Sequence, residues 1–129
     1  MIWIFTVLLY TKESYLGCEM FINVTYETSI PIIKISGELD MYDSNKMEEV
    51  LNSVQPDIDV AIDCSEISFV DSTIIGLFVR YSLARGKYSR SVSLIQVKPF
   101  FIQLLELAKL KKLFIIYENM EQFVSALQG

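Results

Sequence analysis

The chain contains no histidine, so it lacks the side chain that proteins use most often as a general base and as a metal ligand. Only two cysteines are present, Cys18 and Cys64, and they do not form a C-x-x-C pair. A zinc site would have to be built from carboxylates and isolated thiols, so we expect no structural metal. A serine or cysteine nucleophile would also lack a base to activate it, which disfavours acyl-transfer catalysis.

The glycine-rich loops of nucleotide-binding enzymes are missing as well. The sequence has no G-x-x-x-x-G-K-[ST] loop, no G-x-G-x-x-G turn and no G-x-S-x-G elbow. Pairs of carboxylates such as Asp40 with Asp43 do occur, but most pairs of this kind are solvated charges or lie at helix starts. We therefore expect a protein that is not an enzyme and that needs no cofactor.

Basic residues are in the minority, with 11 Lys and Arg against 16 Asp and Glu and a formal net charge of −5. Because they are not gathered into a basic stripe that could follow a phosphate backbone, nucleic acid is not an expected partner. Cys64 ends an apolar run, as a buried, reduced thiol of a cytosolic protein would. These features favour a cytoplasmic protein.

The amino terminus differs from the rest of the chain, because Met1 to Tyr10 is almost wholly apolar. A membrane-spanning helix needs about 20 apolar residues, and a secretory signal needs a basic start and a small-residue cleavage site, so we expect neither membrane insertion nor export. Residues 1–19 could instead add a strand or helix, join two copies as a homodimer, or precede a true start at Met20. If exposed, the run Ile2 to Phe5 would be an aggregation hazard, so we expect it to be covered.

The remaining sequence alternates strand-like and helix-like segments within a length that suits one compact domain. Strands are expected at 20–27, 30–36, 58–62, 91–97 and 113–117, with a further strand-like run at 64–70. Helices are expected at 43–54, 74–87, from Pro99, and from Asn119. Their apolar stripes are Met47, Val50, Leu51 and Val54; Ile75, Phe78, Val79 and Leu83; Phe101, Leu104, Leu105 and Ala108; and Met120, Phe123, Val124 and Leu127. Strands separated by helices require parallel crossovers, so the fold class is α/β.

A short polar step, Asp71-Ser72-Thr73, lies between a strand-like run and a helix-like run. It places a hydroxyl where backbone N–H groups and the positive end of the helix dipole can hold a phosphate. Ser72 is therefore a candidate modification site. The alternative is that Ser72 is simply the helix cap, or that Asp71 is the cap instead.

Two stretches carry a resemblance to a known family. The sequence from Ile58 to Gly76, IDVAIDCSEISFVDSTIIG, resembles the signature of the STAS domain, the family of bacterial anti-sigma factor antagonists. Ser36-Gly37-Glu38-Leu39-Asp40 is similar to the G-E-L-D turn of the same family. The resemblance covers about residues 20 to 128. It implies a single STAS-type domain at 20–129, with a mixed sheet of about four to five strands and about four helices, preceded by an apolar extension at 1–19.

The resemblance also implies a function. In single-domain members, an anti-sigma factor that is itself a serine kinase phosphorylates the serine of the D-S-[ST]-x-x-G step, and the phosphorylated protein no longer binds that kinase. Unphosphorylated protein binds the kinase and so frees a sigma factor. By position, the acceptor is Ser72, with Thr73 as the second choice. Family precedent places the docking surface at Glu38, Asp40, Asp71, Ser72 and Thr73.

One position departs from the family pattern, because members commonly have glycine two residues after the serine and this chain has Ile74. We expect this bulky side chain to alter the contact with the kinase, so Ile74 is counted among the partner-binding positions. The family also contains scaffold proteins and lipid-transport subunits. The alternative function is therefore a scaffold or accessory subunit that does not switch, within a stress-signalling or lipid-transport assembly.

Overall fold

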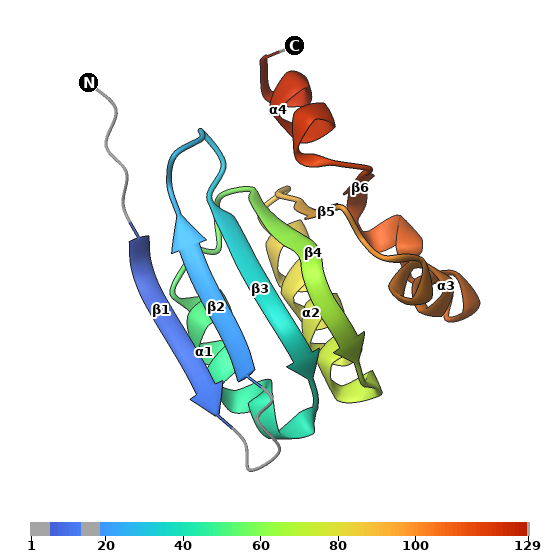
Figure 1. Ribbon diagram of the computed structural model, residues 1–129. Coiled ribbons are helices and arrows are strands. Elements are labelled where there is room, and N and C mark those ends of the chain that lie inside the picture. Colours follow the sequence, from blue (N-terminus) through green and yellow to red (C-terminus); the bar gives the residue numbers. More distant parts are fainter. Residues whose placement is uncertain (1–5, 14–18, 129) are drawn as a thin grey trace.

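The computed structural model describes residues 6–13 and 19–128, which form a six-stranded sheet with helices packed on it (Figure 1). The strands are β1 (Thr6–Glu13), β2 (Glu19–Thr25), β3 (Ile32–Leu39), β4 (Val60–Val70), β5 (Val92–Ile95) and β6 (Ile115–Tyr117). The helices are α1 (Ser44–Asn52), α2 (Ser72–Gly86), α3 (Pro99–Leu107) and α4 (Met120–Gln128), with short 3-10 turns η1 (Met41–Asp43) and η2 (Lys111–Leu113).

The sheet is mixed, and its strands lie in sequence order from β1 to β6. The first three strands are antiparallel to one another, whereas β3, β4, β5 and β6 run parallel. Each parallel connection contains a helix, as crossovers of this kind require. The expected α/β fold with a mixed sheet is confirmed, and β1 adds one strand to the four or five predicted.

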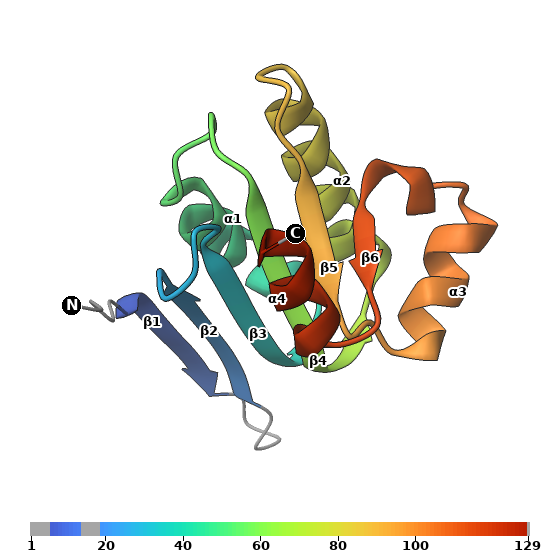
Figure 2. The same cartoon turned by 90° about the horizontal axis from the view of Figure 1, so that it is seen from above.

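Helices cover both faces of the sheet. Helices α1 and α2 lie on one face and α4 on the other (Figure 2). The larger core lies between the sheet and α1, α2 and α3, and includes Ile33, Ile62, Leu51, Phe78 and Phe101. A smaller apolar cluster lies under α4, with Ala61, Ile95 and Phe123 at its centre.

The predicted apolar stripe of α1 is confirmed, and that of α2 is correct only in part, because Phe78 is buried and Ile75 and Val79 pack against the core but Leu83 does not. Met47, Val50, Leu51 and Val54 are all buried, whereas Leu83 on α2 is 53% exposed. The buried face of α2 carries Ile74, Leu77, Phe78 and Tyr81. Apolar residues surround most of this helix, so their spacing fits more than one face, and contact with the sheet selects the face. On α3, Leu104 and Ala108 are likewise exposed.

A buried arginine holds the connection between α1 and β4 in place. Arg85 is 2% exposed and donates hydrogen bonds to the carbonyls of Ile58 (3.1 Å), Gln55 (2.8 Å) and Val54 (3.3 Å). Its guanidinium also lies 4.2 Å from the centre of the Tyr81 ring. Burial lowers the pKa of Arg85, against the opposing effects of Tyr81, Asp57 and Asp59. The helical periodicity gave no sign of this interaction, because a charged residue is usually assigned to the exposed face.

Two other sequence predictions concern Cys64 and the apolar amino terminus. Cys64 is buried and forms no disulfide, as predicted, and burial raises the pKa of its thiol, with a smaller contribution from Asp63. Part of the apolar start is described, because Thr6–Glu13 forms β1 and pairs with β2. The run Ile2 to Phe5 and Cys18 lie outside the described residues. Homodimerisation through this segment therefore stays a prediction.

Candidate functional site

The G-E-L-D turn and the Asp71-Ser72 step lie side by side because β3 and β4 are parallel neighbours. Their last residues pair in register, Glu38 with Phe69 and Leu39 with Val70. The Asp71 amide then donates a hydrogen bond to the Leu39 carbonyl, at 3.2 Å. Carboxyl ends of parallel strands meet at one edge of a sheet, which is where open α/β sheets commonly bind their ligands. The predicted docking residues are thus brought together by the sheet.

The glycine of this turn has a conformational role. Gly37 has a φ of 109°, in the region that favours glycine, and the register between β3 and β4 shifts between Gly37 and Glu38. A residue with a Cβ at this position would strain the turn that carries Glu38 and Asp40.

Asp71 caps α2, so the structure decides between the two alternatives for this helix start. Its Oδ1 accepts a hydrogen bond from the Ile74 amide at 3.0 Å, and its backbone is extended, as an N-cap requires. Its Oδ2 accepts a second hydrogen bond, from the Met41 amide, at 2.8 Å. One carboxylate therefore fixes the start of α2 against the turn η1.

The other two carboxylates of this region cap η1. Asp40 Oδ1 accepts a hydrogen bond from the Tyr42 amide at 2.9 Å, and the Asp40 amide donates to Asp43 Oδ2 at 3.0 Å. Asp43 is 1% exposed, so it is not a solvated charge. Asp43 directly precedes α1, but its carboxylate makes no capping hydrogen bond to that helix and serves the preceding turn instead. This cluster of carboxylates organises backbone rather than forming a catalytic pair.

Ser72 and Thr73 are the first two residues of α2, and both are exposed. In the part of the chain that the structure describes, no hydrogen bond involves the Ser72 hydroxyl, because Asp71 already serves as the cap. The hydroxyl therefore lies at the positive end of the helix dipole and is open to solvent. This is an accessible position for modification by another enzyme.

Ile74 is buried, although we predicted it among the partner-binding positions on the surface. Its side chain is 0% exposed and belongs to the core between the sheet and α2. A docked protein cannot touch it directly, so we withdraw it from the partner-binding positions. The prediction was wrong because Ile74 follows two exposed residues, and the sequence does not show that the helix turns this position inward.

Three exposed apolar side chains near the Asp71-Ser72 step were not predicted from the sequence. Met41 is 57% exposed, Tyr42 82% and Phe69 48%. Exposed apolar patches rimmed by polar residues mark interaction sites in many proteins. We call the surface made by Glu38, Asp40, Met41, Tyr42, Phe69, Ser72 and Thr73 the switch face. The signal available in the sequence was the pair Met41-Tyr42 directly after the G-E-L-D turn.

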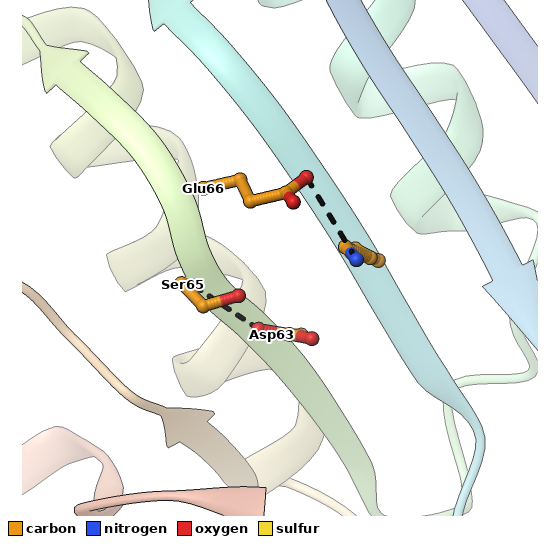
Figure 3. A network of polar contacts seen from close by, with 4 residues as sticks. Asp63, Ser65 and Glu66 are labelled. Atoms are coloured by element: carbon orange, nitrogen blue, oxygen red, sulfur yellow. Dashed lines mark hydrogen bonds and ion pairs between the residues drawn. The ribbon is translucent and has the colours of Figure 1, made fainter.

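A second polar group lies in the middle of the sheet, on the face turned away from α1 and α2 (Figure 3). The Ser65 amide donates to Asp63 Oδ1 at 3.0 Å, and Lys34 Nζ lies 3.7 Å from Glu66 Oε2. Lys34 and Glu66 are about half-exposed, so this ion pair adds little stability. Within residues 6–13 and 19–128, no three potential metal ligands come together, and no helix is long and apolar enough to cross a membrane.

Comparison with known proteins gives the same family as the sequence motifs. The family model described as "Mlab, STAS domain" matches residues 22–117. An anti-sigma-B factor antagonist of Staphylococcus aureus is 30% identical over 102 residues, which cover 78% of this chain and 94% of the relative. A protein of the same name from Staphylococcus epidermidis is 31% identical over 91 residues, covering 69% of this chain and 84% of the relative.

Solved structures show the same fold. An anti-sigma-factor antagonist (STAS) domain protein from Planctomyces limnophilus superposes with a TM-score of 0.71 at 20% identity, covering 84% of this chain and 98% of that one. An anti-sigma factor antagonist from Mycobacterium paratuberculosis gives a TM-score of 0.69 at 19% identity, covering 92% and 100%. Together with the match to the family model, these likenesses establish that the chain belongs to the STAS-domain family.

Proposed function

We propose that this protein is an anti-sigma factor antagonist that acts as a phosphorylatable partner switch in the cytoplasm. In its unphosphorylated form it binds an anti-sigma factor serine kinase and thereby frees a sigma factor for transcription. Phosphorylation of Ser72 ends this binding. The kinase supplies both ATP and catalysis, in keeping with the absence of histidine from this chain.

The observation that carries the proposal is that Asp71 caps helix α2, which leaves the hydroxyl of the exposed Ser72 without a structural role. Asp71 accepts the hydrogen bonds that fix the helix start, at 3.0 Å from Ile74 and 2.8 Å from Met41. The exposed Ser72 hydroxyl is therefore not needed for the fold. A kinase can modify it without removing a structural hydrogen bond.

The switch face also supports docking of a protein partner. Its exposed apolar side chains, Met41, Tyr42 and Phe69, come from η1 and β4, next to the carboxylates of Glu38 and Asp40. Aromatic and methionine side chains are enriched at protein interfaces, where they fill pockets of the partner. The matching surface of the kinase should combine apolar pockets with basic side chains.

A phosphate on Ser72 would act locally. The amino terminus of α2 stabilises negative charge, so the modified protein should stay folded. At the interface, however, the phosphate adds bulk and about −1.5 to −2 charges. A partner carboxylate ~5 Å away would then cost about 3 kcal/mol per charge pair at an effective dielectric near 20, or roughly a hundredfold in affinity. No change of conformation is needed to separate the two proteins.

The phosphorylation step is tested by incubating the protein with the anti-sigma factor kinase of the same genome and ATP, followed by mass spectrometry. We expect one phosphate on Ser72 and none in Ser72→Ala. Thr73→Ala is the matched control, because it removes the neighbouring exposed hydroxyl and should leave phosphorylation unchanged. Undiminished phosphorylation of Ser72→Ala would refute the assignment.

The docking step is tested separately by titrating the kinase, without ATP, against Tyr42→Ala and Tyr88→Ala. Both tyrosines are exposed, at 82% and 54%, so neither truncation should disturb the core. Tyr42 lies on the switch face and Tyr88 follows the other end of α2. We expect Tyr42→Ala to weaken binding at least tenfold, as truncation of an interface anchor does, and Tyr88→Ala to have no effect. Equal losses would contradict docking at the switch face.

A second candidate function is a constitutive accessory subunit of a larger assembly. The observation that favours it is the description of the matching family model, which names Mlab rather than a sigma regulator. Affinity purification from cells distinguishes the two functions. Recovery of a membrane transport complex with protein that carries no phosphate, and without any kinase, would support the accessory subunit.

A further inference from the structure

The charges of this acidic protein are segregated along the chain. Eight of its eleven basic residues lie between Arg80 and Lys112, where Glu106 is the only acidic residue. The corresponding part of the structure runs from the second half of α2 through β5 and α3 to η2.

A groove lies within this basic region, between the carboxyl-terminal half of α2 and the segment that leads from η2 into β6. Its volume is about 540 Å³. Its lining includes the cations Lys87, Arg90 and Lys112 and the apolar residues Leu83, Leu113, Phe114 and Ile115, together with Ser82, Gly86 and Ser91. Leu83 and Ile115 are 53% and 45% exposed, so the groove presents apolar surface to solvent.

Hydrogen bonds hold the walls of the groove in place. The Ser82 hydroxyl on α2 donates to the Leu113 carbonyl at 2.5 Å, which ties the helix to η2. The Arg90 amide donates to the Arg85 carbonyl at 3.0 Å, which fixes the turn after α2. A ligand would therefore meet a formed groove and would not have to open it.

In the described part of the chain, the three cations of the groove have no acidic partner. Within the described residues, no carboxylate forms an ion pair with Lys87, Arg90 or Lys112, whereas neighbouring Lys111 lies 3.9 Å from Glu106. The dipole of α2 accounts for a cation at Lys87, which directly follows the helix. It does not explain why Arg90 and Lys112, from two other segments, border the same exposed apolar surface.

We infer that this groove is a docking site for an acidic, amphipathic segment of a partner protein. Its apolar side chains would lie against Leu83 and Ile115, and its carboxylates would face Lys87, Arg90 and Lys112. The concave shape suits a protein segment better than a flat membrane surface, and the apolar lining does not suit a phosphate backbone. Charge complementarity selects an acidic partner.

The groove is separate from the switch face. Helix α2 has 15 residues, so its two ends lie roughly 22 Å apart at 1.5 Å per residue. Ser72 is at the first end, and Gly86 and Lys87, which border the groove, are at the second. Binding in the groove should therefore be independent of Ser72 phosphorylation.

The probe for a test is a labelled synthetic helical peptide with leucine on one face and glutamate on the other, titrated into the full-length protein by fluorescence anisotropy. A second peptide carries serine in place of each leucine. We expect the double variant Arg90→Glu/Lys112→Glu to weaken binding of the first peptide at least tenfold, and Leu83→Ser about fivefold. The serine peptide should bind at least tenfold more weakly than the leucine peptide.

Lys98→Glu is the matched control, because it reverses an exposed charge in the same basic region but outside the groove. It should change affinity less than twofold, as should Ser72→Asp. Backbone amide shifts in NMR spectra should map the peptide to the segments 82–91 and 112–115, which line the groove. Equal weakening by Lys98→Glu, equal binding of both peptides, or tighter binding to phosphatidylglycerol vesicles or to a single-stranded oligonucleotide would overturn the proposal.

Discussion

The two hydrogen bonds of the Asp71 carboxylate can be separated by substitution. Asp71→Asn keeps an oxygen that can cap α2 at the Ile74 amide, but its NH₂ group cannot accept from the Met41 amide. Asp71→Ala removes both bonds. The pair of variants therefore distinguishes a residue that only caps a helix from one that joins α2 to η1.

The structure sets the expected magnitudes. A hydrogen bond to a charged group in this half-exposed position contributes about 1 kcal/mol, and the negative charge at the helix start adds roughly 0.5 kcal/mol. Loss of the cap itself costs about 1 kcal/mol more. We therefore expect the free energy of unfolding to fall by about 1.5 kcal/mol in Asp71→Asn and about 2.5 kcal/mol in Asp71→Ala.

The assay is urea denaturation followed by circular dichroism, with the m-value as a check that the unfolding transition itself is unchanged. Glu27→Gln is the matched control, because this exposed carboxylate accepts no hydrogen bond in the described part of the chain and its replacement should cost less than about 0.5 kcal/mol. If Asp71→Asn is as stable as the parent protein, the bond to Met41 contributes nothing. If it is as unstable as Asp71→Ala, capping and bridging cannot be separated as argued.

Two further predictions concern the core. Arg85→Met should lower the free energy of unfolding by about 3 kcal/mol in urea denaturation, because the carbonyls of Val54, Gln55 and Ile58 lose their donor; a loss below about 1 kcal/mol would contradict this role. Stability should also fall at alkaline pH, since burial raises the pKa of Cys64 above its ordinary 9.0 and that of Tyr81 from 10.0 to about 12, so that only the unfolded chain releases these protons. The loss of stability should begin near pH 9 and reach about 1.4 kcal/mol per pH unit for each group. In Cys64→Ala it should begin only near pH 10, where Tyr81 of the unfolded chain ionises. A stability that does not change between pH 8 and pH 11 would refute this prediction.

Local patterns in the sequence predicted the fold class and most of the elements, although they left β1 open and divided β4 into two runs, 58–62 and 64–70. The spacing of Met47, Val50, Leu51 and Val54 predicted the buried face of α1 correctly, because polar residues fill the rest of that helix. Asn119 was predicted to begin the last helix, and its side chain does accept a hydrogen bond from the Gln122 amide, at 2.9 Å. Such features depend on residues three or four positions apart, which the sequence displays directly.

The buried face of α2, the position of Ile74 and the carbonyl contacts of Arg85 could not be obtained in this way. These features result from contacts between segments that are far apart in the chain. Arg85 and Gln55, for example, are 30 residues apart, as are Met41 and Asp71, which are also hydrogen-bonded. Helix α2 has apolar residues on most sides, so only its packing against the sheet decides which of them are buried.

The sequence by itself determined the order of strands and helices, the absence of catalytic machinery built on histidine, and the family to which Ser72 and the G-E-L-D turn point. Only the tertiary structure decided that Asp71 and not Ser72 caps the helix, that Ile74 is buried, and that Met41, Tyr42 and Phe69 are exposed. It also placed Lys87, Arg90 and Lys112 around one groove. The physical reason is that secondary structure follows from short-range spacing, whereas a binding surface is made where parallel strands and packed helices bring distant residues together.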